Sequence, residues 1–277
     1  MLGQAVLRQL AARPGLNVRA TVRTHTTRDL LEPHLASLVR AGVDAADFDS
    51  LVDVLTEARP DVVVNCIGLV KQRDAGNDPL AAIPINALLP HRLARLCELL
   101  EGRLVHFSTD CVFDGARGGY TEADFCTATD VYGRTKLLGE LDAPHTITLR
   151  TSMIGPELDS QRGLLAWFLD QKSTVKGFRR AVFSGVTTLE LARIVADHVL
   201  PRRDLHGVYH VGAEPIAKFD LLTLIGQIYG HRVPIEPDDS VVIDRSLDSS
   251  RFRSATGYRP PSWNQMITEM RDQSHVD

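Results

Sequence analysis

Short apolar runs alternate along the chain with longer stretches in which apolar residues recur at helical spacing. The runs are brief and rich in β-branched residues, which is typical of buried strands. We expect strands at residues 17–22, 61–65, 103–107, 146–149 and 208–211. Strands that alternate with helices indicate a parallel sheet covered by helices, so the pattern predicts an α/β fold.

The helical stretches carry recognisable signals. Residues 88–100 hold leucines on one helical face, and residues 1–13 have the pattern of a helix that no strand precedes. Thr187 and Glu190 have the spacing of a capping box, which predicts a helix from that point. After Val211 prolines separate shorter segments, and we expect a smaller lobe there.

Composition excludes several function classes. The chain of 277 residues has 31 Lys and Arg against 35 Asp and Glu, a net charge of -4, so no basic excess is available for nucleic-acid phosphates. No apolar run approaches the roughly 20 residues that span a bilayer, and no signal peptide is evident. The four cysteines are widely spaced, the usage of a reducing compartment. We therefore expect a cytoplasmic protein without nucleic-acid or membrane partners.

Metal and hydrolase chemistry have little support. The ten histidines form no HExxH motif and no carboxylate-flanked cluster, and His206 and His210 lie around a strand. We expect no metal site. Nucleophile motifs of the SxxxK or GxSxG type with matching partners are also absent from the sequence.

Tyr132 and Lys136 form the strongest chemical candidate. Their spacing of i and i+4 puts both on one helical face, so their head groups can meet. A phenol with a pKa of about 10 is a poor acid or base at neutral pH, and a nearby ammonium lowers that pKa. The pair alone also suits an ordinary solvated helix. Thr109 follows a predicted strand, where its hydroxyl either meets a substrate carbonyl or caps its own turn.

A series of motifs runs along essentially the whole chain. They are Val64 to Gly68, Ile85-Asn86-Ala87, Ser108 to Gly115, Tyr120 to Asp124, Val131 to Glu140, Leu149 to Ser152, Leu247 to Phe252 and Gly257 to Trp263. In number and order these motifs resemble the extended short-chain dehydrogenase/reductases, specifically the dTDP-4-dehydrorhamnose reductase family, and together they are far more specific than any one alone.

The resemblance implies a Rossmann-type, doubly wound parallel sheet with a smaller substrate-binding lobe. Residues 1–150 and 183–212 would form the NAD(P)-binding domain, and residues 151–182 and 213–277 the sugar-nucleotide lobe. The implied activity is hydride transfer from a reduced nicotinamide to the C4 keto group of a nucleotide-linked 4-keto-6-deoxy sugar, in deoxysugar and polysaccharide biosynthesis. A homodimer is also expected.

The same resemblance implies roles for individual residues. Tyr132 would protonate the nascent alkoxide, Lys136 would lower the pKa of the tyrosine and bind the nicotinamide ribose, and Thr109 would orient the carbonyl. On the substrate side the candidates are Ser108, Asp110, Arg150, Ser152, Lys176 and Arg180. The basic residues among them suit a diphosphate, although solvated surface charge explains each equally well.

The cofactor side departs from the family pattern. Only Gly3 represents the GxxGxxG turn that lets the backbone approach a pyrophosphate. We expect either a start codon assigned at an internal methionine, with a protein about ten residues longer so as to include a first strand, or a real truncation that weakens cofactor binding.

Other residues point to the cofactor. Arg23 follows a predicted strand where an acid would favour NAD, so NADPH is expected and NADH stays possible; a solvated arginine is the alternative. Asp47, with Asp44 as competitor, would meet the adenine. Asn65 and Gly68 would line the nicotinamide side.

Two other functions remain open. The family's relatives include a regulatory subunit of methionine adenosyltransferase, a non-catalytic NADP-binding role that a damaged glycine turn would suit. An epimerase or dehydratase on the same scaffold is the second. Cys111, and Cys66 with Ile67 after Asn65, differ from the commonest family forms, so the nucleotide and the sugar stay undetermined.

Overall fold

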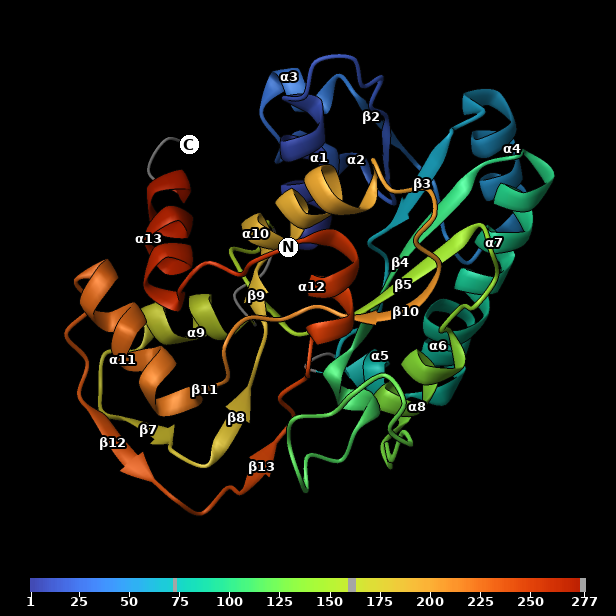
Figure 1. The fold of residues 1–277 in the computed structure, drawn as a ribbon. Coiled ribbons are helices and arrows are strands. Elements are labelled where there is room, and N and C mark those ends of the chain that lie inside the picture. The colour runs from blue at the N-terminus through green and yellow to red at the C-terminus, as the bar shows by residue number, and fades with distance from the viewer. Residues whose placement is uncertain (72–73, 159–162, 275–277) are drawn as a thin grey trace.

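A computed structural model describes residues 1–71, 74–158 and 163–274. Its centre is a parallel sheet of four strands in the order β10-β5-β4-β3 (Figure 1). The strands are β3 (Val62–Asn65), β4 (Arg103–Thr109), β5 (Thr146–Thr151) and β10 (Gly207–His210). The sheet confirms the predicted α/β class and four of the predicted strands.

A second parallel pair joins β1 (Ala20–Val22) and β2 (Val39–Ala41). In the part of the chain that the structure describes, neither strand pairs with the larger sheet. β1 begins three residues later than the predicted start at Asn17. The pattern did not delimit β2, because a strand of three residues with one buried position carries almost no alternation.

Two hydrophobic cores flank β4. Successive strand residues point to opposite faces, so Leu104 packs with Leu93 of α7 (Leu89–Leu99) and Leu55 of α4 (Phe48–Ala58). Val105 faces the other core, which includes Val6 of α1 (Leu2–Ala11). The helices α10 (Thr188–Ile194) and η3 (Val195–Val199) complete that core beside α1. The result is a sheet between two helical layers.

The predicted helices are present, although their bounds differ from those expected. Thr187 caps α10, and its hydroxyl accepts a 3.2 Å hydrogen bond from the backbone N–H of Glu190. The helix expected at residues 88–100 begins earlier, as α6 (Pro79–Ala82) and the π-helical segment η1 (Ile83–Leu88), before it continues as α7. Further short helices are α2 (His25–Asp29), α3 (Pro33–Ala36) and α5 (Asp74–Asn77).

The smaller lobe gathers beside the sheet (Figure 1). It holds the strand groups β11-β8-β13 and β12-β7, with α9 (Leu164–Asp170) and α11 (Lys218–Tyr229). Its strands are β7 (Val175–Phe178), β8 (Ala181–Phe183), β11 (Ile216–Ala217), β12 (Ile235–Asp238) and β13 (Ile243–Asp244), and the pair β6 (Met153–Ile154) and β9 (Val186–Thr187) lies next to α10.

The C-terminal helices divide between the two parts. α13 (Trp263–Ser274) packs against α11 of the lobe. α12 (Ser250–Thr256) lies instead against β10, although the sequence assigns it to the lobe. The cause is Phe252, which is fully buried and meets Tyr209 of β10 edge-to-face with ring centroids 6.0 Å apart. The boundaries proposed for the two domains therefore place one sheet-bound helix on the lobe side.

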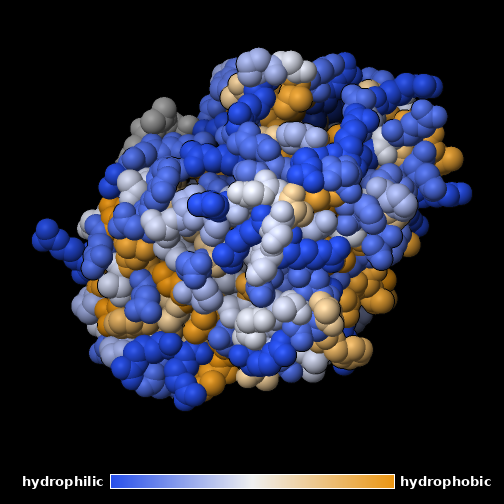
Figure 2. Space-filling model, viewed as in Figure 1, coloured by the Kyte–Doolittle hydropathy of each residue, from blue (hydrophilic) through white to orange (hydrophobic). Residues whose placement is uncertain are grey.

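The face drawn in Figure 2 is largely hydrophilic, and its apolar residues lie in small separate groups. Among the residues that the structure describes, no helix is long and apolar enough to cross a membrane.

Candidate active site

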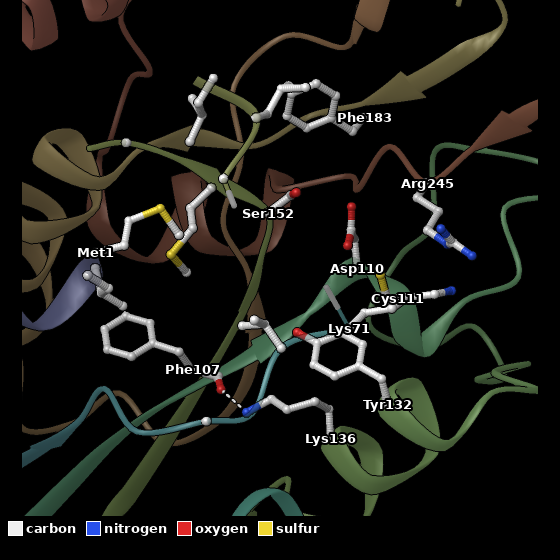
Figure 3. Close-up of a pocket in the computed structure, with 18 of the residues that line it drawn as sticks. Met1, Lys71, Phe107, Asp110, Cys111, Tyr132, Lys136, Ser152, Phe183 and Arg245 are labelled. Carbon is white, nitrogen blue, oxygen red and sulfur yellow. Dashed lines mark hydrogen bonds between the residues drawn. The ribbon is translucent and has the colours of Figure 1, made fainter. Parts of the chain in front are cut away.

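A cavity of about 710 Å³ opens where the carboxyl ends of β3, β4 and β5 face the smaller lobe (Figure 3). Open parallel sheets place their ligand sites at this edge. Its lining includes the predicted residues Gly3, Asn65, Gly68, Ser108, Asp110, Tyr132, Lys136 and Ser152. The predicted residues outside the lining are Arg23, Asp47, Thr109, Arg150, Lys176 and Arg180.

Tyr132 and Lys136 lie on α8 (Val131–Leu138) and extend from it in the same direction (Figure 3). Asp130 caps this helix, since its carboxylate accepts a 2.7 Å hydrogen bond from the backbone N–H of Gly133. A Cβ at Gly133 would stand 2.3 Å from the carbonyl oxygen of Cys111. Glycine therefore permits α8 to approach the turn that follows β4, which brings both cavity-lining elements together.

The ammonium group of Lys136 is buried and has defined partners. Its Nζ donates a 2.6 Å hydrogen bond to the carbonyl oxygen of Phe107 and lies 3.5 Å from Nε2 of His106. Burial lowers the pKa of Lys136 to about 8, and the carboxylate of Glu140 opposes this shift. Near neutral pH the lysine thus keeps its charge by a small margin.

The pKa of Tyr132 corrects one sequence-based expectation. We expected Lys136 to lower it, but burial raises the pKa of the phenol well above its ordinary value, and Cys111 adds to this effect. A hydrogen bond with Thr109 acts in the opposite direction without reversing the shift. Burial has the larger effect on the pKa because the phenolate loses more hydration free energy than its hydrogen bonds restore. Tyr132 therefore holds its proton at neutral pH, the state that an acid requires.

The hydroxyl of Thr109 forms hydrogen bonds within its own turn. Its hydroxyl oxygen accepts a 3.1 Å hydrogen bond from the backbone N–H of Cys111 and lies 3.2 Å from Oδ1 of Asp110. It caps the short helix η2 (Asp110–Val112). Asp110 rather than Thr109 lines the cavity. Burial raises the pKa of the Asp110 carboxyl, and the positive charge of Arg245 moderates that shift.

Arg150 occupies a buried network instead of the cavity. Its guanidinium binds both carboxylate oxygens of Glu140, at 2.8 and 2.6 Å. Ser108 donates a 2.6 Å hydrogen bond to the same carboxylate, and His210 lies 3.2 Å from Nη1 of Arg150. Because these partners satisfy the guanidinium away from the cavity, the structure argues against the predicted diphosphate contact of Arg150.

The predicted cofactor residues separate into two groups. Gly3, Asn65 and Gly68 line the cavity, and the N-terminal end of α1 reaches it. Arg23 is exposed directly after β1 and does not line the cavity. Asp47 also lies outside the lining, where its carboxylate caps α4 through a 3.1 Å hydrogen bond from the N–H of Asp49.

The cations at the cavity differ from those that the sequence suggested. Lys176 is exposed and pairs with Asp238 at 2.9 Å, and Arg180 is exposed on the turn between β7 and β8. The cavity is lined instead by Lys71, Lys218 and Arg245. Arg245 stands two residues before Leu247, where the Leu247-to-Phe252 motif begins, a signal that could have pointed to it. Lys218 and Lys71 stand in no motif.

Comparison with known proteins decides the family. The family model described as the RmlD substrate binding domain matches residues 1–276. The chain belongs to this family. Its Rossmann-like sheet is therefore the fold of the RmlD family, as the sequence motifs implied.

Individual RmlD relatives show the extent of the similarity. The dTDP-4-dehydrorhamnose reductase of Burkholderia thailandensis is 35% identical over 128 residues, an alignment that spans 43% of this chain and 43% of that protein. A hypothetical dTDP-4-dehydrorhamnose reductase from Sulfolobus tokodaii has a TM-score of 0.77 at 26% identity, covering 95% of this chain and 94% of that one.

A third comparison concerns the fold alone. The crystal structure of dTDP-4-dehydrorhamnose reductase from Bacillus anthracis in complex with NADP has a TM-score of 0.76 at 20% identity, covering 92% of this chain and 98% of that chain. The RmlD fold thus extends over nearly the whole chain, whereas the Burkholderia thailandensis alignment spans less than half of the relative's length.

Proposed function

We propose that this RmlD-family chain reduces the C4 keto group of a nucleotide-linked 4-keto-6-deoxy sugar with a reduced nicotinamide, preferentially NADPH. The observation that carries the proposal is the position of Tyr132 and Lys136. They line one cavity between the end of α1 and the smaller lobe, where a cofactor and a sugar can meet. The names of the relatives support the substrate class, and the NADP complex of the Bacillus anthracis protein supports the cofactor.

The residues on the sheet side fit a dinucleotide. The first N–H groups of α1 have no partner within the helix, and the positive end of the helix dipole favours a phosphate there. Gly3 and Gly68 place no side chain in the cavity, and Asn65 also contributes to its lining. A bound nicotinamide would supply the hydride, and these residues would hold and orient it.

Tyr132 supplies the proton that reduction requires. The raised pKa keeps its phenol protonated, so it can donate the proton to the oxygen of the carbonyl as negative charge develops there. Lys136 helps to hold Tyr132 in position, because its hydrogen bond to Phe107 anchors α8 to the end of β4. A hydrogen bond with Thr109 opposes the rise in the pKa of the phenol, but it does not reverse that rise.

The lobe supplies the groups that suit a sugar nucleotide. Arg245 donates from Nε to the carbonyl oxygen of Phe113 at 2.8 Å, which fixes the guanidinium at the cavity wall. Lys218 lines the same cavity at the start of α11. Both are placed to pair with a diphosphate, which charged hydrogen bonds recognise well. We assign them the role that the sequence suggested for Arg150, Lys176 and Arg180.

The test is NADPH oxidation by the purified chain with a dTDP-linked 4-keto-6-deoxy sugar. We expect turnover with NADPH faster than with NADH, and a loss of about 10²- to 10⁴-fold in kcat for Tyr132→Phe, the range of general acid catalysis. The Phe variant should bind NADPH as the parent does, since only a hydroxyl is removed. An equally active variant would sink the mechanism, and NADPH binding without turnover on any keto sugar would favour the regulatory role.

A homodimer and a cytoplasmic location belong to the same proposal. Leu80 of α6, Ile83 and Leu88 of η1, and Leu138 of α8 are exposed apolar side chains on elements that pack together. Such a surface suits a second copy of the chain. All four cysteines are free thiols, as in proteins of reducing compartments. Light scattering of the parent chain and of Leu138→Glu tests the dimer.

A further inference from the structure

His106 is a fully buried histidine that the proposed chemistry does not use. It lies in the middle of β4 and shares a strand face with Leu104 and Ser108, but it does not itself line the cavity. Its strand neighbour across the ladder is Asn65 of β3. Burial lowers the pKa of the imidazole, and the nearby charge of Lys136 lowers it further. His106 is therefore neutral, with one proton on one ring nitrogen.

The hydrogen bonds of Asn65 identify that nitrogen. The backbone N–H of Ile67 donates to Oδ1 of Asn65 at 3.1 Å, which fixes the orientation of the amide. The amide Nδ2 then faces Nδ1 of His106 at 3.1 Å. An amide nitrogen only donates, so Nδ1 accepts. The single proton of the neutral ring must lie on Nε2, the nitrogen that faces Lys136.

Nε2 of His106 lies 3.5 Å from Nζ of Lys136. An N–H group directed at an ammonium offers it no acceptor, whereas it can donate to a neutral amine. The ammonium keeps the carbonyl oxygen of Phe107 as its acceptor, at 2.6 Å. We propose that His106, oriented by Asn65, is a positioning residue that turns an N–H toward Lys136 and so controls both the direction and the protonation of the lysine head group.

Other charged and titratable groups surround α8, and the proposal has to be separated from them. Glu140 favours the charged lysine, and Asp130 at the start of the helix pairs with Lys71 at 2.6 Å. Further groups are Tyr132 and Arg134 on α8 itself, Asp110 and Cys111 on η2, Arg245 near Asp130, and His91 on α7, whose ring lies 2.7 Å from the carbonyl oxygen of Leu138. His106 is distinguished from these groups by its ring nitrogen Nε2, which lies 3.5 Å from the lysine nitrogen.

The tautomer can be tested on the unaltered chain. Two-dimensional ¹⁵N–¹H NMR that links the ring nitrogens to the ring carbon-bound protons distinguishes a protonated from an unprotonated nitrogen. We expect a neutral His106 with its proton on Nε2 throughout pH 6–9, the range around the ordinary histidine pKa of about 6.5. A proton on Nδ1, or a charged ring in this range, would overturn the proposal.

The effect of His106 on the pKa of Lys136 can be tested with His106→Gln. A glutamine amide can turn its oxygen to the ammonium, so we expect the pKa of Lys136 to rise by at least about one unit from about 8. The chain has five lysines, which makes ¹³Cε-lysine NMR titration practical, and Lys136→Met assigns the signal. His145→Gln is the matched control, since that imidazole bonds the backbone oxygen of Ala94 at 3.0 Å, outside the cavity lining.

An unchanged pKa of Lys136 in a folded His106→Gln protein would refute the inference. If that variant does not fold, Asn65→Leu frees the tautomer of His106 and should raise the pKa of Lys136 in the same direction. The meaning for catalysis rests on the proposed function, but these titrations need no turnover. A chain that fails to reduce keto sugars therefore leaves the result on Lys136 intact. In an active chain, the alkaline limb of kcat/KM should move upward with the lysine pKa.

Discussion

Lys136 on α8 donates a 2.6 Å hydrogen bond to the backbone carbonyl of Phe107, the residue before the Ser108-Thr109-Asp110 turn. One buried charge thus joins the helix that carries Tyr132 to the strand end that carries the turn. The arrangement is costly for stability, because burial disfavours the ammonium. Functional sites commonly keep destabilising groups of this kind, because activity requires them.

We predict that Lys136→Met stabilises the fold while it abolishes reduction. The pKa of Lys136 is about 8 in the folded chain and 10.5 ordinarily, so the unfolded chain binds more protons between these values. The stability of the parent chain should therefore rise with pH across this window. The variant, without the buried charge, should be about 1–3 kcal/mol more stable at pH 7 and lose this advantage near pH 10.5.

Urea unfolding of both proteins at pH 7 and at pH 10 measures this difference. A variant that is less stable than its parent at pH 7 would show that the hydrogen bond to Phe107 outweighs the cost of burying the charge.

Glu140→Gln should destabilise the fold strongly. The side chains of Glu140 and Arg150 are 8% and 6% exposed, and the pair is joined by two hydrogen bonds. Removing one charge leaves the other buried and uncompensated, which costs about 3–5 kcal/mol. Denaturant midpoints report it. The control is Glu57→Gln, because its pair with Arg40 is solvent-exposed and should contribute below about 1 kcal/mol. Equal losses in the two variants would contradict a structural role for the buried network.

Arg245→Gln separates substrate binding from cofactor binding. Loss of a charged hydrogen bond of about 1.5–3 kcal/mol should raise KM for the nucleotide sugar about 10- to 100-fold. The Kd for NADPH, measured by fluorescence titration, should stay unchanged because Arg245 lies on the lobe side of the cavity. Arg180→Gln serves as the comparison, since its side chain is exposed outside the lining. A larger effect from Arg180 would restore the assignment made from sequence.

Some of these relationships could be predicted from the sequence. The spacing of Tyr132 and Lys136 put them on one face of a helix, and the order of motifs placed them at the edge of a parallel sheet. Local geometry is sufficient for such predictions, because i and i+4 positions coincide on any α-helix. The capping box at Thr187 followed from the same kind of rule.

The partners of each charged group depended on tertiary structure. Arg150 and Arg245 look alike in the sequence, yet one binds Glu140 in the interior and the other lines the cavity. The direction of the Tyr132 pKa shift depended on how completely the cavity wall excludes water, which helical spacing does not encode. His106 acquired its tautomer from Asn65, a residue of a neighbouring strand 41 positions away. The sequence by itself determined which residues share a helix face or a strand end, and packing decided which of them meet the cavity, because desolvation and pairing act between segments that only the folded sheet brings together.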